Sequence, residues 1–248
     1  MAPIESGPII ITGASGGIGL ALTEYLVKSG FGNLVCQYRT SSDRLLDVFA
    51  GAGIDGHRRV VQADLTDEEA VTRFRGVVES EYGAPYALIN LAGGTSNCLS
   101  WKLSVDEFRR VFDQNVLTTF LMCREFAPGM RKCGCGRIIN TSSVVAFKGV
   151  AGAAHYCAAK AAIIGFSKAI ALELAPKNVC VSVIALGYFE YGMIEKVPTS
   201  LRAEMLRTIP AQRFGSVADI GGLISFLLGE GGAYTNGQVY HLNGGLYS

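Results

Sequence analysis

The stretch Pro8-Ile9-Ile10-Ile11-Thr12-Gly13-Ala14-Ser15-Gly16-Gly17-Ile18-Gly19 decides the fold of this chain. It begins with an apolar run from Pro8 to Thr12, which is typical of a buried strand, and it ends in a glycine-rich turn. From Ile18 to Lys28, apolar residues recur at helical spacing. A strand that turns tightly into a helix is the first unit of a doubly wound α/β sheet.

Further short apolar runs mark the rest of the predicted sheet. They lie at residues 34–38, 59–62, 87–90, 137–140 and 179–185, and helical patterns fill the gaps between them. Strands that alternate with helices predict right-handed βαβ units, hence a parallel sheet covered on both faces. No linker, charge run or repeat divides the pattern, so we expect one domain over residues 1–248. Residues 187–210 lack a clean period, and we expect them to form a substrate lid.

The composition excludes several classes of function. The formal net charge is +1 and the basic residues are scattered, so neither nucleic acid nor a membrane surface is an expected partner. No apolar run reaches the roughly 18 residues of a membrane span, and no signal peptide is recognisable, so we expect a cytoplasmic protein. The seven cysteines lack paired spacing, and Cys133-Gly134-Cys135 has no neighbouring ligands, which indicates free thiols and no metal site.

The glycine-rich turn is the first candidate site. Glycines let the backbone approach a pyrophosphate closely, and the helix amino terminus offers unpaired N–H groups and the positive end of its dipole. A tight turn without any ligand is the alternative interpretation. The candidate phosphate-binding residues are Gly13, Ser15, Gly16, Gly17, Ile18 and Gly19.

The end of the second strand indicates which dinucleotide binds, because the adenosine ribose lies there in a doubly wound sheet. The sequence at that place is Gln37-Tyr38-Arg39-Thr40, and no carboxylate precedes Asp43. A guanidinium pairs with a 2′-phosphate, so Arg39 and Thr40 favour NADP(H) over NAD(H), unless Arg39 is an ordinary solvated residue. Further cofactor contacts are predicted after the third and fourth strands, from Asp64, Leu65, Asn90, Ala92 and Gly93.

Tyr156 and Lys160 form the candidate catalytic pair. Their four-residue spacing in an alanine-rich stretch places both side chains on one face of a predicted helix. A phenol ordinarily has a pKa of about 10, and we expect the Lys160 ammonium to lower that pKa. Ser143 follows the predicted strand at 137–140 and can donate a hydrogen bond to a substrate oxygen. The alternative is that Tyr156 and Lys160 merely occupy a half-exposed helix face.

On these residues the chain resembles the short-chain dehydrogenase/reductases over nearly its whole length. The match rests on the cofactor turn 12–19, the Asn-Asn-Ala-Gly-like segment 90–93, the triad Ser143, Tyr156 and Lys160, and the closing stretches 237–240 and 243–245. The resemblance implies a single-domain Rossmann fold with a mainly parallel sheet of about seven strands. It also implies a homotetramer or homodimer, assembled through the two long helices that follow Leu103 and Tyr156.

The resemblance also implies a reaction. Hydride would pass between a nicotinamide and a carbonyl or alcohol carbon, and Tyr156 would give or take the proton on oxygen. Ser143 would polarise that oxygen, and Lys160 and Tyr156 would also contact the nicotinamide ribose. Asn115 matches the family's fourth catalytic residue and would anchor a water that links Lys160 to solvent.

Two positions depart from the family's pattern. Leu186 stands where the family usually has Pro, and Tyr191 stands where a Thr often holds the carboxamide of the nicotinamide. Backbone groups of Gly187 and Phe189 are the remaining candidates for that contact.

Within the family, residues 95–107 and 163–168 are most similar to bacterial β-ketoacyl-thioester reductases, with sugar or other secondary-alcohol dehydrogenases as the alternative. Aromatic and apolar lid residues favour an acyl chain or an aromatic ketone as substrate, unless they pack against a neighbouring subunit: Tyr188, Phe189, Tyr191 and Met193. An acidic acyl carrier protein is then a candidate partner, and basic residues at the site entrance would receive it, with Arg131, Lys132 and Arg137 as candidates. A catalytically silent nucleotide-sensing protein is the alternative from another class, and the complete triad argues against it.

Overall fold

One parallel sheet organises the molecule. The computed structural model describes residues 7–248, except for the side chains of Met193 and Lys196. Within that range seven strands pair in the order β3-β2-β1-β4-β5-β6-β7, and every neighbouring pair is parallel. The strands are β1 (Ile9–Thr12), β2 (Leu34–Tyr38), β3 (Val60–Gln62), β4 (Ala87–Asn90), β5 (Gly136–Ser143), β6 (Val179–Leu186) and β7 (Val239–Leu242). The predicted doubly wound fold is confirmed.

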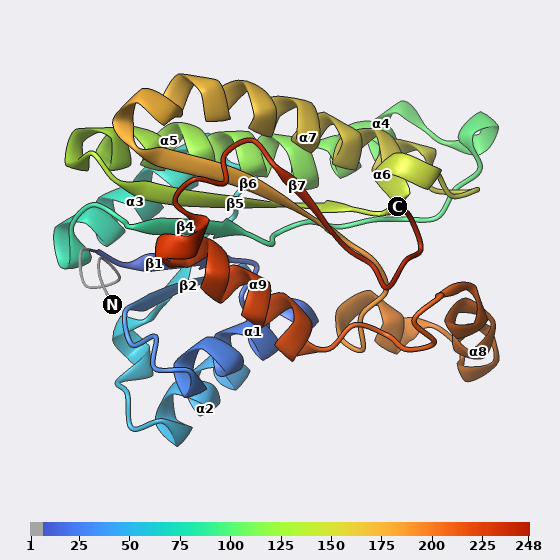
Figure 1. Ribbon diagram of the computed structural model, residues 1–248, viewed down its shortest axis with the longest axis horizontal. Helices are drawn as coiled ribbons and strands as arrows, with labels where there is room; N and C mark the ends of the chain where they lie inside the picture. The colour runs from blue at the N-terminus through green and yellow to red at the C-terminus, as the bar shows by residue number, and fades with distance from the viewer. Residues whose placement is uncertain (1–6) are drawn as a thin grey trace.

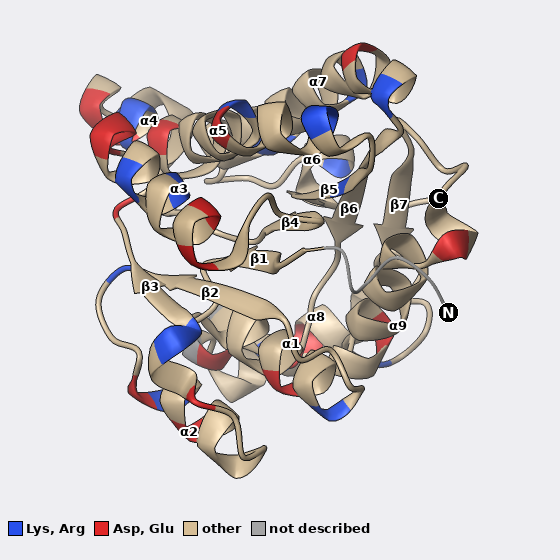
Figure 2. Ribbon diagram, turned by 90° about the vertical axis from the view of Figure 1, so that its left-hand side faces the viewer, with Lys and Arg blue, Asp and Glu red and all other residues tan. Residues whose placement is uncertain are grey.

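Helices cover both faces of the sheet (Figures 1 and 2). One layer consists of α1 (Gly17–Lys28), α2 (Asp43–Gly51) and α9 (Val217–Leu228). The other consists of α3 (Glu68–Tyr82), α4 (Val105–Phe112), α5 (Thr118–Cys133) and α7 (Ala154–Leu174). Ile9 and Ile11 pack into the core of the first layer, whereas Ile10 packs into the core of the second. The apolar run of β1 is continuous because both of its faces are buried.

Strand β5 is longer than its apolar pattern predicts. Polar residues begin at Asn140, where the sequence suggests an end, yet pairing continues from Thr141 with Ile184 to Ser143 with Leu186. The neighbouring strand β6 is buried throughout, and its backbone groups need partners, so the ladder continues through polar side chains. Ser143 is therefore the last residue of a strand.

Segment 187–210 contains regular structure that its sequence pattern does not predict. A short 3₁₀ segment, η6, covers Gly192–Lys196, and the helix α8 covers Thr199–Thr208. Figure 1 shows α8 at the carboxyl-terminal end of the sheet, the end that also carries the short helix α6 (Val145–Lys148). The sequence predicts Met193 as a lid contact, but the side chain of Met193 lies outside what the structure describes. No helix in the described range is long and apolar enough to cross a membrane.

Candidate active site

The glycine-rich turn is held against the ends of two neighbouring strands. Gly13 adopts a left-handed conformation (φ +62°), and a Cβ atom there would lie 2.9 Å from the Ala92 Cα. The Gly13 N–H donates to Gln37 Oε1 at 2.8 Å, and the Gly16 N–H closes the turn on Gly13 O at 3.0 Å. A side chain at position 13 would separate the turn from the loop after β4, so glycine is required there.

Thr12 and Gln37 have structural roles that the sequence analysis did not assign. The Thr12 hydroxyl accepts hydrogen bonds from the backbone N–H groups of Leu91 and Ala92, both at 3.1 Å. The Gln37 amide accepts from Gly13 and donates to Ala63 O at 2.7 Å. Both side chains are almost fully buried, at 1% and 3% exposure, and buried polar groups require partners. A polar residue near the end of an otherwise apolar strand is the sequence signal for this role.

The start of α1 is shaped for an anion. A Cβ atom at Gly19 would run into the Gly13 carbonyl oxygen, and one at Gly17 would run into the backbone of Gly192. Gly16, the N-cap, provides no side-chain hydrogen bond to the first turn. The N–H groups of that turn are therefore left for a ligand, and a pyrophosphate fits them in charge and in the close approach that the glycines permit.

A pocket of about 450 Å³ runs along β3 and the first half of α3, and Arg39 and Asp64 line it where β2 and β3 end. The Arg39 guanidinium is exposed and makes no hydrogen bond or ion pair within residues 7–248. Asp64 Oδ1 accepts from the N–H and the hydroxyl of Thr66, and these two bonds lower the pKa of the Asp64 carboxyl. Leu65 is buried and Thr40 is exposed. The pocket thus offers an unpaired cation and a fixed carboxylate, as an adenosine 2′-phosphate and an adenine amino group require.

The Asn90 side chain lies beneath the site. Its amide donates to Asn140 Oδ1 at 2.8 Å, and Asn140 donates in turn to Ser167 Oγ at 2.9 Å. All three residues are buried. This chain of hydrogen bonds joins β4, β5 and α7 and holds the Asn90 side chain in the interior. The backbone that follows Asn90, rather than its side chain, therefore extends toward the cofactor turn.

Ser143, Tyr156 and Lys160 meet at the carboxyl end of β5. Tyr156 and Lys160 lie one turn apart on α7, with Lys160 Nζ 5.7 Å from the centre of the phenol ring. Lys160 is 4% exposed and donates to Thr141 O at 3.0 Å. The Ser143 hydroxyl bonds to Leu186 O at 3.4 Å and is near enough to Tyr156 to lower the pKa of its phenol. The three side chains predicted from spacing are therefore neighbours in space.

The pKa values of the pair correct one expectation. Burial raises the pKa of Tyr156 to about 12, and the neighbouring Ser143 hydroxyl offsets only part of that change. Burial also lowers the pKa of Lys160 to about 8. The prediction that Lys160 lowers the phenol pKa below its usual value is wrong for the protein alone, because desolvation is the largest cause of the shift at Tyr156 and the cause of the shift at Lys160. At neutral pH Tyr156 is therefore fully protonated, the form that donates a proton.

Asn115 lies on a π-helical turn, Asp113–Leu117, between α4 and α5. Its amide donates to Gly94 O at 2.7 Å and to Val111 O at 2.8 Å, whereas its buried Oδ1 has no partner within the described residues. A Cβ atom at Gly93 would lie 2.6 Å from that Oδ1 and 3.5 Å from Lys160 Nζ. A buried acceptor of this kind requires a donor, and a water or a ligand hydroxyl fits the place.

The carboxyl end of β6 limits what the lid residues can do. The Gly187 N–H donates to Leu242 O at 2.9 Å, and a Cβ atom at Gly187 would lie 2.6 Å from the Asn243 Cα. Phe189 is 3% exposed, and its ring packs against Gly215. The side chain of Phe189 thus belongs to the core, which leaves its backbone as the group that can face a cofactor.

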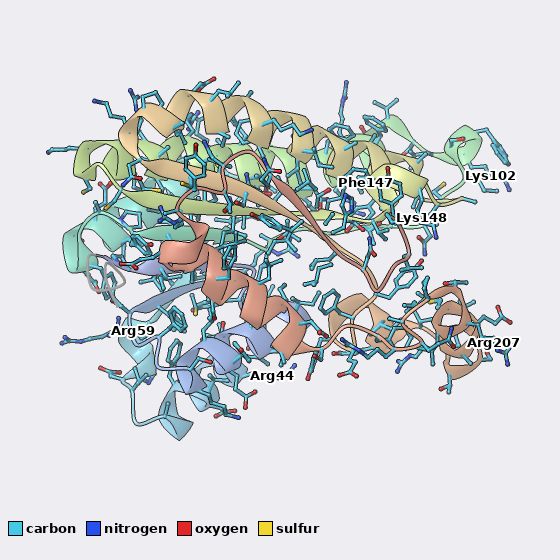
Figure 3. All side chains as sticks on the ribbon, in the orientation of Figure 1. Arg44, Arg59, Lys102, Phe147, Lys148 and Arg207 are labelled. Carbon is cyan, nitrogen blue, oxygen red and sulfur yellow. The ribbon has the colours of Figure 1, made fainter. Side chains whose placement is uncertain are left out.

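The predicted basic entrance is wrong within the single chain. Arg131 and Lys132 lie in the last turn of α5, and Arg137 is buried near the amino-terminal end of β5, where Nη1 donates to Gly136 O. The catalytic serine is at the opposite end of that strand. Other cations, Lys102, Lys148 and Arg207, lie at the carboxyl-terminal end of the sheet (Figure 3), and none of them forms an ion pair within residues 7–248.

Fold and site together define an oxidoreductase of the nicotinamide-dependent kind, with a dinucleotide turn beside a Ser-Tyr-Lys triad. The sequence profile of the short chain dehydrogenases matches residues 8–201, and the chain belongs to that family. It is 33% identical to the 3-oxoacyl-[acyl-carrier-protein] reductase FabG of Salmonella typhimurium, covering 96% of both chains. It is 34% identical to FabG of Vibrio harveyi and 35% identical to an acetoacetyl-CoA reductase of Acinetobacter sp., covering 98% of each chain in both cases.

Proposed function

We propose that this protein is an NADP(H)-dependent ketoreductase that reduces the 3-oxo group of an acyl thioester to a secondary alcohol. The observation that carries the proposal is the convergence of Ser143, Tyr156 and Lys160 beside Asn115 and the glycine turn. The relatives are reductases of 3-oxoacyl and acetoacetyl thioesters by name, and they match this chain over almost its full length.

The protein's own residues supply the proton and orient the substrate. Bound NADPH supplies the hydride. Tyr156 is protonated at neutral pH and donates to the carbonyl oxygen as that oxygen gains negative charge. The Ser143 hydroxyl donates a second hydrogen bond to the same oxygen. Lys160, with a pKa near 8, keeps most of its charge at pH 7 and stabilises the phenolate that remains. Asn115 Oδ1 provides an acceptor for a water through which the proton is replaced.

Arg39 supports NADP(H) as the cofactor, because its unpaired guanidinium directly follows β2, where the adenosine ribose is expected in a doubly wound sheet. We expect Arg39→Asp to change the ratio of kcat/KM for NADPH over NADH by about tenfold or more toward NADH, from the loss of a charge-assisted contact. Arg44→Asp, on the exposed start of α2, is the matched charge control. An unchanged ratio in Arg39→Asp removes Arg39 from the cofactor site.

The substrate class is tested with a panel of 3-oxoacyl thioesters, simple ketones and sugars, each followed by nicotinamide absorbance. We expect the thioesters to give the largest kcat/KM. An acyl carrier protein is the proposed partner, and the acidic carrier would meet the cations at the carboxyl-terminal end of the sheet, Lys102, Lys148 and Arg207. If sugars or polyols give the largest kcat/KM, the proposal is wrong and the protein is a secondary-alcohol dehydrogenase.

Three further features complete the proposal. Segment 187–210 acts as the lid, since Gly192 lies against the start of α1 at Gly17. The seven thiols are unpaired, as a reducing cytoplasm requires.

The protein forms a homodimer or homotetramer through α5 and α7, on which Phe120 (38%) and Leu172 (79%) are exposed.

A further inference from the structure

The loop of residues 93–99 forms one wall beside the triad. It follows β4, and three contacts hold it. The Asn115 amide donates to Gly94 O at 2.7 Å, the Cys98 N–H donates to Gly152 O at 2.8 Å, and Gly93 lies against Asn115 and Lys160. The loop therefore passes between the π turn and the start of α7.

A histidine that the mechanism does not use makes a fourth contact with this loop. His155 precedes Tyr156 on α7 and is 1% exposed. Its Nε2 lies 2.9 Å from Ser96 Oγ, whereas its buried Nδ1 has no partner within the described residues. A buried imidazole thus links the backbone next to Tyr156 directly to the middle of the 93–99 loop.

The contact continues beyond Ser96 to a charged pair on α4. Two bonds from the Arg110 guanidinium, at 2.6 and 2.7 Å, hold the Glu107 carboxylate. Arg110 and then the Ser96 hydroxyl lower the pKa of Glu107 to about 2, so this carboxylate is charged and accepts. The Ser96 hydroxyl, which contacts His155 Nε2, also influences this carboxylate, so Ser96 connects the buried imidazole with the charged pair.

The chain of contacts ends next to a second catalytic residue. Arg110 Nη1 donates to Gln114 Oε1 at 3.0 Å, and Gln114 directly precedes Asn115. A Cβ atom at Gly94 would lie 2.5 Å from the same Oε1, so the loop and the amide are in close contact. The His155 network, defined as His155, Ser96, Glu107, Arg110 and Gln114, thus encloses the loop from Tyr156 on one side to Asn115 on the other.

We propose that His155 is a positioning residue that, through this network, holds the 93–99 loop as the wall contacting the body of the substrate and so sets substrate affinity. The proposal rests on the proposed ketoreductase function. No member of the His155 network belongs to the Ser143, Tyr156 and Lys160 triad, and the pocket at Arg39 is lined by other residues. Loss of the network should therefore weaken substrate binding in the ground state and the transition state alike, and it should leave proton transfer and NADPH binding intact.

The experiment compares His155→Leu and Ser96→Ala with the parent enzyme. We expect KM for the best thioester to rise about fivefold or more, while kcat and the Kd for NADPH stay within about twofold, since a wall contact is lost and the chemistry is kept. Amide hydrogen exchange in residues 93–99 should become faster in both variants. His155→Gln should restore KM, because its side-chain amide reaches the place of the imidazole Nε2. His57→Leu, at an exposed histidine outside the loop and the network, is the matched control and should behave as the parent.

Unchanged KM in both variants overturns the proposal, whether or not exchange of the loop becomes faster, because the network then only braces the fold. A kcat that falls at constant KM also overturns it. If His155→Leu does not fold, Ser96→Ala decides, since it removes one partly buried hydroxyl. Should the parent reduce no thioester, the proposed function fails, and the same comparison with the ketone it does reduce still decides the role of His155.

Discussion

At the scale of single residues, burial decides the chemistry of the site more than charge does. Lys160 Nζ lies 5.7 Å from the centre of the Tyr156 ring, yet desolvation moves the pKa of the phenol up and that of the ammonium down. The pair is therefore set for proton donation from Tyr156 rather than for phenolate formation. A cation that is buried with one hydrogen bond also costs stability, as active-site groups commonly do.

Tyr156→Phe tests the proton donor. The change keeps the ring and removes only the hydroxyl, so the variant should fold and should bind NADPH with the parent's Kd. Turnover in ketone reduction should fall by about a hundredfold or more, the usual cost of losing a general acid. Steady-state assays and a cofactor fluorescence titration measure the two quantities. A variant within a few-fold of the parent rate contradicts the mechanism.

Lys160 predicts a pH dependence of stability. The unfolded chain keeps this proton up to a pKa of 10.5, whereas the folded protein releases it at about 8. Between those values the unfolded state binds more protons, so stability rises with pH. From about pH 7 to about pH 9.5, urea unfolding of the apoprotein should show on the order of 2 kcal/mol more gain in the parent than in Lys160→Met. If the free energies of unfolding of the parent and Lys160→Met change equally with pH, Lys160 is not a buried cation with a lowered pKa.

At the scale of elements, the site is built where strands end and glycines let backbones meet. The turn after β1 contacts the loop after β4, the start of α1 contacts η6, and the carboxyl end of β6 contacts the loop after β7. Each contact occurs at a glycine where a Cβ atom would lie under 3.0 Å from a neighbouring backbone atom. These glycines therefore act through packing, in addition to any contact with a cofactor.

A pair of glycine substitutions separates packing from helix propensity. Gly19→Ala places a methyl group against Gly13 O at the start of α1, so we expect lower stability and weaker NADPH binding. Gly76→Ala, on the exposed side of α3 with nothing within 4 Å, should raise the free energy of unfolding by about 0.5–1 kcal/mol. Chemical denaturation of both variants provides the measurement. A Gly19→Ala protein as stable as the parent would mean that the turn shifts freely.

At the scale of the whole molecule, large apolar side chains are exposed on α7 and in the loop beside it. Leu172 is 79% exposed on α7, and Tyr234, in the loop that bonds to the neighbouring Ala171 through Asn236, is fully exposed. Figure 2 shows charged residues of both signs dispersed over the two helix layers. The homodimer or homotetramer proposed above would bury Leu172 against a second copy of the chain.

Leu172→Glu should weaken that assembly. A charge in the middle of an apolar contact is costly, so the variant should elute as a smaller species than the parent in size-exclusion chromatography with light scattering. The fold should be kept, since the side chain is exposed in the single chain. Lys177→Glu, an exposed position beyond the end of α7, is the charge control. Equal masses for Leu172→Glu and the parent exclude this face as the interface.

The sequence by itself determined the first six strands in chain order, their alternation with helices, the glycine turn and the spacing of the catalytic pair. Local pattern was sufficient there, because buried strands require continuous apolar runs and Tyr156 and Lys160 share a face of any helix. The extension of β5 to Ser143, the helix α8 and the roles of Thr12 and Gln37 depended on partners distant in the chain. The raised pKa of Tyr156 depended on burial. Arg131 and Lys132 are distant from the triad because α5 ends at the opposite end of the sheet. Those are properties of three-dimensional neighbours, and only the tertiary structure decided them.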